Sequence, residues 1–198
     1  MIPYGKHKIH KSDILEIENV LKSDFITQGP KTKNFQESIS KFTNSKYCVV
    51  SNSASSSLII ACKAIGLSKN DTVWTVPNSY VATANCALHC GAKIDFVDID
   101  INTGNISIEK LEQKLKIASN NNSLPKLIIT VHFAGLPTEQ ELIFDLSKKY
   151  KFKIIEDCAQ AHGAEYQGKK VSTFGNLGTF SFFPSKNLGC FGDGGCIV

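Results

Sequence analysis

The chain has 198 residues, of which 42% are hydrophobic and 20% are charged, and its formal net charge at pH 7 is +4. These values are ordinary for a globular protein with a sizeable core, and the lysines form no long basic block, which argues against a nucleic-acid-binding face. No apolar run approaches the length of a membrane span, and the seven cysteines, an odd number, show no evident disulfide framework, so we expect a cytoplasmic protein with free thiols.

Helical and strand patterns alternate along the chain. Strands of four to eight residues, several of them almost wholly apolar, are separated by helices of ten or more, which indicates βαβ units and a mainly parallel sheet in an α/β fold. In chain order, the pattern predicts helices at 11–23 and 32–42, a buried strand at 47–52, helix 53–67, strand 72–77, helix 80–91, strand 93–100, helix 107–118 with Ser107 as its N-cap, strand 126–133, helix 138–150, strand 152–157, and short strands around 179–183 and 194–198.

Ligands of such sheets bind beyond the carboxyl ends of the strands, so the residues that follow each strand are candidates for a site. The stretch SNSASSSL, Ser51 to Leu58, leads directly from a strand into a helix. Its amides and hydroxyls, together with the helix dipole, form an anion site suited to phosphate, although a serine-rich N-cap alone explains the stretch more simply. Tyr80 lies at the next strand-to-helix turn, where it would stack on a flat ligand or, more commonly, fill the core.

Two charged residues stand out later in the chain. Asp157 ends an apolar strand, where a lone carboxylate is unfavourable unless it meets a cation, although capping or ion pairing would also explain it. Lys186 follows 29 residues later, between the aromatic run FSFF and the glycine-rich GCFGDGG. A lysine held behind this run would lose part of its hydration, which favours the neutral amine that acts as a nucleophile, and the glycines would let the backbone approach a ligand ring.

Other cofactor classes are disfavoured. The chain contains neither a GxGxxG fingerprint nor a Walker A loop, and GCFGDGG precedes a strand instead of a helix. Cys86, His89 and Cys90 could suggest a metal, but the stretch resembles a helix end and lacks a second pair of ligands nearby. We therefore predict no metal site.

Pyridoxal phosphate would use all of these groups together. Its phosphate suits the serine-rich turn, its ring would stack on Tyr80, its ring nitrogen needs a carboxylate such as Asp157, and its aldehyde condenses with a lysine. Lys186, once displaced by an amine substrate, would carry the proton as general base and then as general acid.

Several stretches resemble one known family over almost the whole chain. They are NSASSSL, VDID, VHFAGLP and IIEDCAQAHGAEYQGKKVSTFGNLGTFSFFPSKNLGCFGDGG. They are similar to the sugar aminotransferases of the DegT/DnrJ/EryC1/StrS family, and this resemblance implies the large domain of the type I, aspartate-aminotransferase-like fold with helices on both faces of its sheet. The N-terminal stretches resemble one subgroup more closely, the UDP-4-amino-4,6-dideoxy-N-acetyl-β-L-altrosamine transaminases of pseudaminic acid synthesis.

The resemblance also implies roles for individual residues. Lys186 matches the lysine that joins the cofactor, Asp157 the partner of the pyridine nitrogen, and Gln160 the residue against the ring and its hydroxyl. The remaining cofactor contacts are Tyr80, which matches the stacking aromatic, and Ser55, Ser56 and Ser181, which match the phosphate ligands. By family pattern the reaction is amination of a 4-keto-6-deoxy sugar nucleotide, with glutamate as the amino donor, for surface-glycan synthesis.

Complete family members are about twice as long as this chain. We therefore expect residues 1–198 to form the N-terminal segment and most of the cofactor-binding large domain of a homodimer, without the small C-terminal domain. Two alternatives stay open: a dehydratase on the same fold, and an inactive cofactor-binding fragment. Lys186 speaks against the first, because the related dehydratases carry histidine in its place.

Overall fold

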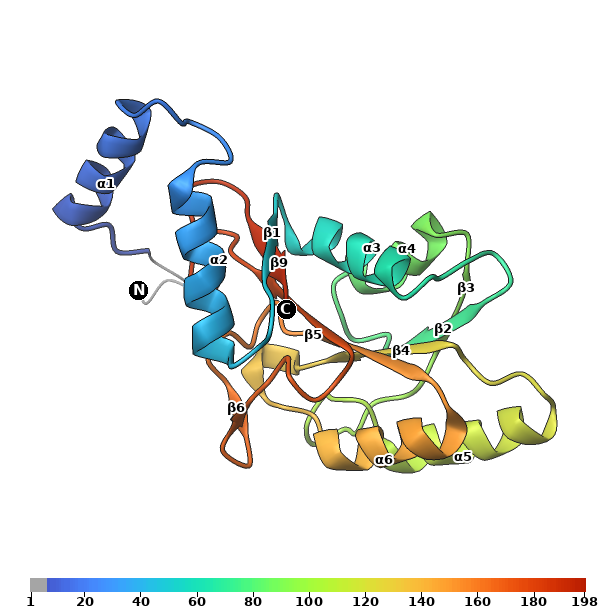
Figure 1. Ribbon diagram of the computed structural model, residues 1–198. Coiled ribbons are helices and arrows are strands. Elements are labelled where there is room, and N and C mark those ends of the chain that lie inside the picture. Colours follow the sequence, from blue (N-terminus) through green and yellow to red (C-terminus); the bar gives the residue numbers. More distant parts are fainter. Residues whose placement is uncertain (1–6) are drawn as a thin grey trace.

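The computed structural model describes residues 7–198, and its centre is a seven-stranded sheet (Figure 1). Only β9 runs antiparallel to its neighbours among these strands, so the predicted mainly parallel sheet is confirmed. Across the sheet the strands are β1 (Val49–Ser51), β9 (Gly195–Ile197), β8 (Leu177–Ser181), β5 (Lys153–Asp157), β4 (Leu127–Val131), β2 (Thr72–Thr75) and β3 (Lys93–Phe96).

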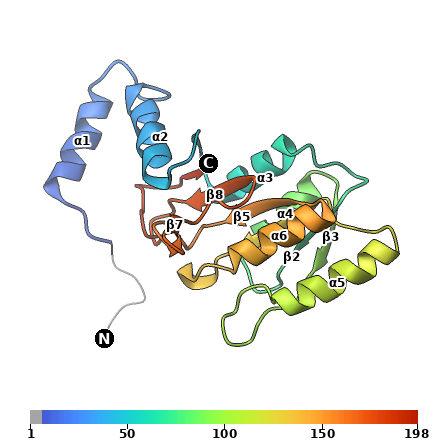
Figure 2. The ribbon, with the colours of Figure 1, turned by 60° about the horizontal axis from the view of Figure 1, so that its bottom comes forward.

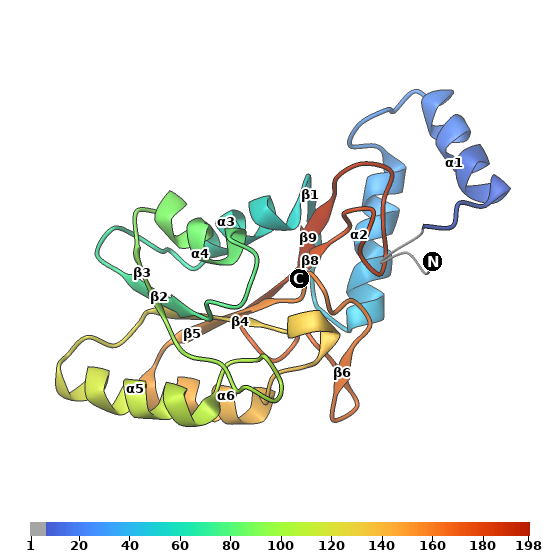
Figure 3. The same ribbon diagram turned by 180° about the vertical axis from the view of Figure 1, so that it is seen from behind.

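Helices cover both faces of this sheet, as Figures 1 and 3 show from opposite sides. On one face lie α3 (Ala54–Ala64) and α4 (Ala82–His89), and on the other lie α5 (Ile108–Asn120) and α6 (Gln140–Tyr150). Serines cap two of them as expected: Ser53 Oγ accepts the amide of Ser56, and Ser107 Oγ accepts the amide of Lys110.

Each face of the sheet has its own hydrophobic core, formed by alternate side chains of the strands. Because successive strand residues point to opposite sides, neighbouring residues of one strand enter different cores. Val73, Leu127, Ile129 and Ile155 pack with α3 and α4, whereas Trp74, Ile128 and Ile154 pack with α5 and α6. These side chains are almost completely buried, and each contributes about 1.5–3 kcal/mol to folding.

The two N-terminal helices differ in how they meet the sheet. The helix α2 (Pro30–Thr43) packs Ile39 and Phe35 against Phe182 and its neighbours. The helix α1 (Lys11–Leu21) stands away from the sheet in Figures 1 and 2 and buries none of its own residues.

Two details differ from the sequence prediction. The strand predicted as buried at 47–52 is the short edge strand β1, and 55% of Val49 is exposed, because β1 has a neighbour on one side only. A small hairpin of β6 (Glu165–Tyr166) and β7 (Lys169–Lys170) was not predicted. Within residues 7–198, no helix is both long enough and apolar enough to cross a membrane.

Candidate active site

A cavity of about 420 Å³ opens at the edge where the parallel strands end. The starts of α3 and α4, the ends of β4 and β5, and the loop between β8 and β9 all contribute to it. This is the position that the topology favours for a ligand. Six of the seven site residues predicted from the sequence line this cavity: Ser55, Tyr80, Asp157, Gln160, Ser181 and Lys186.

The start of α3 forms one wall, and Ser56 is not among the residues that line it. The amide and hydroxyl of Ser56 instead contact the Oγ of Ser53, each at 3.1 Å. Ser53 lines the cavity itself and was missed, although its place as N-cap of a serine-rich helix is a signal visible in the sequence. The amides of Ala54 and Ser55 belong to the first helical turn, whose N–H groups have no acceptor within a helix, so this end suits an anion.

Gly195 allows β9 to pass directly over the start of α3. A Cβ added at Gly195 would lie 2.4 Å from the carbonyl carbon of Ser53 and 2.5 Å from the nitrogen of Ala54. The sequence predicts that the glycines of GCFGDGG, which include Gly195, let the backbone approach the ring of a ligand. At Gly195 the close neighbour is instead the start of α3, so this glycine shapes the wall of the cavity at that helix start.

Asp157 places a buried carboxylate in the cavity. Only 5% of the residue is exposed. Its Oδ2 accepts the hydroxyl of Thr83 at 2.8 Å, and its Oδ1 accepts the amide of Ala159 at 3.1 Å. Burial raises the pKa of Asp157, while these two hydrogen bonds and the nearby charge of Lys186 act in the opposite direction. Such a group is poised to receive a cationic partner.

Gln160 is oriented by the backbone of a neighbouring loop. The amide of Ala134 donates to Gln160 Oε1 at 2.8 Å. Because an N–H group can donate only to the oxygen end of a side-chain amide, this contact fixes which end of Gln160 is which. The Nε2 group is therefore the end available as a donor to the cavity.

Lys186 is half-buried on the loop that follows β8. Its aromatic surroundings differ from the prediction, because Phe180 and Phe182 point away from the cavity and pack with α2. Of the aromatic run, only Phe183 lines the cavity with Lys186. Strand alternation explains this, since Ser181 lies between the two buried phenylalanines and faces the opposite way.

Tyr80 lies at the mouth of the cavity and 72% of it is exposed. Its alternative interpretation as a core aromatic is therefore wrong. Its ring is available to a ligand at the turn that leads into α4.

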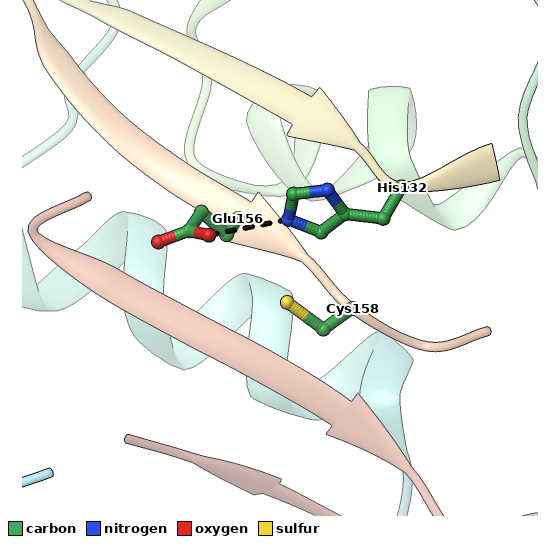
Figure 4. A group of neighbouring side chains, drawn as sticks. All are labelled: His132, Glu156 and Cys158. Carbon is green, nitrogen blue, oxygen red and sulfur yellow. Dashed lines mark hydrogen bonds and ion pairs between the residues drawn. The ribbon is translucent and has the colours of Figure 1, made fainter. Parts of the chain in front are cut away.

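A second cluster of ionisable groups lies beside the cavity, on the other side of β5. Figure 4 shows His132, Glu156 and Cys158, all buried, with His132 Nε2 at 3.2 Å from Glu156 Oε2. His132 Nδ1 accepts an amide, so Nε2 carries the hydrogen. Glu156 also accepts three backbone amides, those of Ser172, Phe174 and Gly175, at 2.7–2.8 Å.

These contacts use both carboxylate oxygens of Glu156, which identifies the cluster as an anchor for the chain segment 172–175 and not as a metal site. The cysteines of the C-x3-C spacing lie elsewhere: Cys86 Sγ is 3.6 Å from Cys62 Sγ, and His89 is exposed.

Comparison with known proteins places this geometry in a family. Residues 7–198 match the family described as the DegT/DnrJ/EryC1/StrS aminotransferases. The chain is 39% identical, over 198 residues, to the UDP-4-amino-4,6-dideoxy-N-acetyl-β-L-altrosamine transaminase of Campylobacter jejuni, covering all of this chain and 51% of that protein. The chain thus spans about half the length of the curated relatives it matches.

Solved structures of sugar aminotransferases resemble this chain as well. PseC of Helicobacter pylori, an aminotransferase involved in the biosynthesis of pseudoaminic acid, is 33% identical with a TM-score of 0.91, covering 99% of this chain and 51% of PseC. The sugar aminotransferase Spr1654 of Streptococcus pneumoniae, solved in its PLP-form, is 27% identical with a TM-score of 0.89, covering 98% of this chain and 52% of Spr1654.

A dehydratase shares the fold as well. GDP-4-keto-6-deoxymannose-3-dehydratase (ColD) is 30% identical with a TM-score of 0.89, covering 99% of this chain and 50% of ColD. The matches and the strand order confirm the predicted large domain of a type I pyridoxal-phosphate-dependent transferase. The chain belongs to the DegT/DnrJ/EryC1/StrS aminotransferase family.

Proposed function

We propose that the protein is a pyridoxal-phosphate-dependent aminotransferase that transfers an amino group from glutamate to a 4-keto-6-deoxy sugar nucleotide, for the synthesis of surface glycans. One observation carries the proposal: Lys186 and the buried carboxylate of Asp157 line the same cavity as the start of α3. An amine, a carboxylate and an anion-binding helix start are the three groups that this cofactor needs from a protein.

The residues fit the cofactor at both ends. Asp157 is a buried carboxylate whose pKa is raised by burial, so a cationic N–H group placed against it would relieve an unfavourable environment. At the other end, the amides of Ala54 and Ser55 and the hydroxyl of Ser181 would bind the phosphate. Ser56 would not contact the phosphate itself but would hold the side chain of Ser53, which its amide and hydroxyl contact.

Each remaining residue has a role that follows from its position. When bound, the cofactor supplies an electron sink for the substrate carbon. Lys186 would hold the cofactor through its Nζ atom and, once released, would take and return the proton at that atom. Gln160 would donate from Nε2 to an oxygen of the cofactor, and Tyr80 would offer its ring for stacking at the mouth of the cavity.

The share of the relatives' length that this chain covers supports a proposal about the whole protein. We place residues 1–198 as the N-terminal segment and most of the cofactor-binding domain of a cytoplasmic homodimer, with a small C-terminal domain in the other half. Coverage of 51% of the Campylobacter jejuni transaminase and of PseC supports this division.

The alternative is a dehydratase, which the likeness to ColD supports. An amine at position 186 argues against it, since a dehydratase must avoid amino transfer.

The experiment incubates the full-length protein with pyridoxal phosphate, glutamate and a UDP-linked 4-keto-6-deoxy sugar, and follows the product by mass spectrometry. Aminotransfer gives an amino sugar and 2-oxoglutarate, whereas dehydration gives loss of water. Lys186→Ala should abolish the amino sugar, and Lys63→Ala, an exposed lysine outside the cavity, should not.

A further inference from the structure

Two hydroxyl groups lead from the mouth of the cavity to the buried carboxylate. Ser79 Oγ lies 2.8 Å from Thr83 Oγ1, and Thr83 Oγ1 lies 2.8 Å from Asp157 Oδ2. The direction of these bonds follows from the chemistry of the groups. An ionised carboxylate only accepts, so the single hydroxyl hydrogen of Thr83 goes to Asp157, and Ser79 must then donate to Thr83.

The first turn of α4 creates this arrangement. Thr83 belongs to this turn and Ser79 to the loop just before it, and the bond from the Thr83 amide to the Tyr80 carbonyl at 3.0 Å joins the loop to the helix. Only 1% of Thr83 is exposed, so its hydroxyl has no water to replace a lost partner. Asp157 reaches it from the end of β5, 74 residues away in the sequence.

Thr83 and the Ala159 amide are the two groups among residues 7–198 that donate directly to the carboxylate, one to each oxygen. Other titratable groups surround it without donating. Lys186 on the loop after β8 favours the charged form, and His132 on the β4 side donates from Nε2 to Glu156 instead. The thiols of Cys86 on α4 and Cys158 after β5 would oppose the charged form only if ionised. Thr83 is thus one of two contacts that fix both the charge and the plane of this side chain.

We propose that Ser79 and Thr83 form a relay of hydrogen bonds that keeps Asp157 ionised and oriented toward the cavity, with Thr83 as a positioning residue for the reaction. The importance of that orientation rests on the function proposed above, because Asp157 acts on the nitrogen of the cofactor ring. The relay itself is a property of the protein without any ligand, and it can be measured separately.

The experiment compares Thr83→Val, which keeps the branched shape and removes the hydroxyl, with Thr83→Ser, which restores it. Thr75→Val is the matched control, because Thr75 is a fully buried threonine whose hydroxyl donates to the Ile129 carbonyl at 2.9 Å, outside the cavity. The titration of Asp157 is followed in ligand-free protein by carboxyl carbon NMR, with the signal assigned by its loss in Asp157→Asn.

In Thr83→Val the titration midpoint of Asp157 should rise, and the affinity for pyridoxal phosphate should fall roughly tenfold, as for loss of one hydrogen bond to a charged group. Thr83→Ser and Thr75→Val should keep the wild-type midpoint. An unchanged midpoint in Thr83→Val overturns the relay. Should that variant not fold, Ser79→Ala removes the outer hydroxyl and should raise the midpoint less, and no rise there overturns the relay as well. If wild type binds no pyridoxal phosphate, the proposed function fails, but the titration still decides on the relay.

Discussion

Asp157 and Lys186 line the same cavity although they are 29 residues apart and lie on different elements, the end of β5 and the loop after β8. Neighbouring parallel strands explain the meeting, because β5 pairs directly with β8 and the chain beyond each strand emerges at the same edge. The cavity therefore holds one buried carboxylate and one amine that can form a covalent bond.

The charge of Asp157 should be necessary for activity. Asp157→Asn keeps the shape of the side chain but cannot hold a proton on the ring nitrogen, so turnover should fall on the order of 100-fold or more. The control is Asp145→Asn on the exposed side of α6, which should leave turnover unchanged. Steady-state kinetics on the full-length variants measure both, and equal loss in the two variants would contradict the role of Asp157.

The same substitution should stabilise the ligand-free protein at neutral pH. Burial raises the folded-state pKa of Asp157, so the folded state binds more protons than the unfolded state between the two pKa values, and stability falls as the pH rises through that window. The gain from Asp157→Asn should therefore be absent below the unfolded pKa of about 3.9 and complete above the folded pKa. Urea denaturation at several pH values tests this. A gain that grows toward acid pH would reverse the sign and refute it.

Glu156 should contribute to the free energy of unfolding through its hydrogen bonds, and it places no charge in the cavity. Its two oxygens accept three backbone amides and His132 Nε2. Glu156→Gln turns an NH2 group toward some of these donors, so the free energy of unfolding should fall by about 3 kcal/mol. Glu165→Gln, whose exposed carboxylate pairs with Lys170 at 2.7 Å, is the control and should change it by less than about 1 kcal/mol. A similar decrease in the free energy of unfolding in both variants would show that the buried hydrogen bonds of Glu156 stabilise the fold no more than the exposed ion pair does.

Gly195 should be the glycine most sensitive to a methyl group at the phosphate end of the cavity. Gly195→Ala must move β9 or the start of α3, at a cost of about 1–3 kcal/mol, and should also weaken pyridoxal phosphate binding. Gly66→Ala is the comparison, because its φ is +77° but an added Cβ meets no atom within 4 Å, so it reports backbone strain alone. Unaltered affinity in Gly195→Ala, measured by titration with the cofactor, would rule out this part of the site.

The sequence predicts the site where local pattern and topology suffice. Asp157 and the serine-rich turn could be found because parallel strands bring their carboxyl ends to one edge. The contact of Thr83 with Asp157 could not, since it joins residues 74 apart through the packing of α4 on the sheet. The approach of Gly195 to Ser53 likewise depends on β9 lying beside β1, a pairing between strands far apart in the sequence that no local pattern encodes.

Identifying the residue that binds the cofactor covalently is the most direct test of the proposed site. The protein is incubated with pyridoxal phosphate, reduced with borohydride, digested and mapped by mass spectrometry. We predict that the reduced adduct is found on Lys186, and that it is missing from Asp157→Asn or much reduced there because the ring is held less tightly. An adduct on a different lysine, or one spread over the exposed lysines in wild type, would contradict the assignment of this cavity.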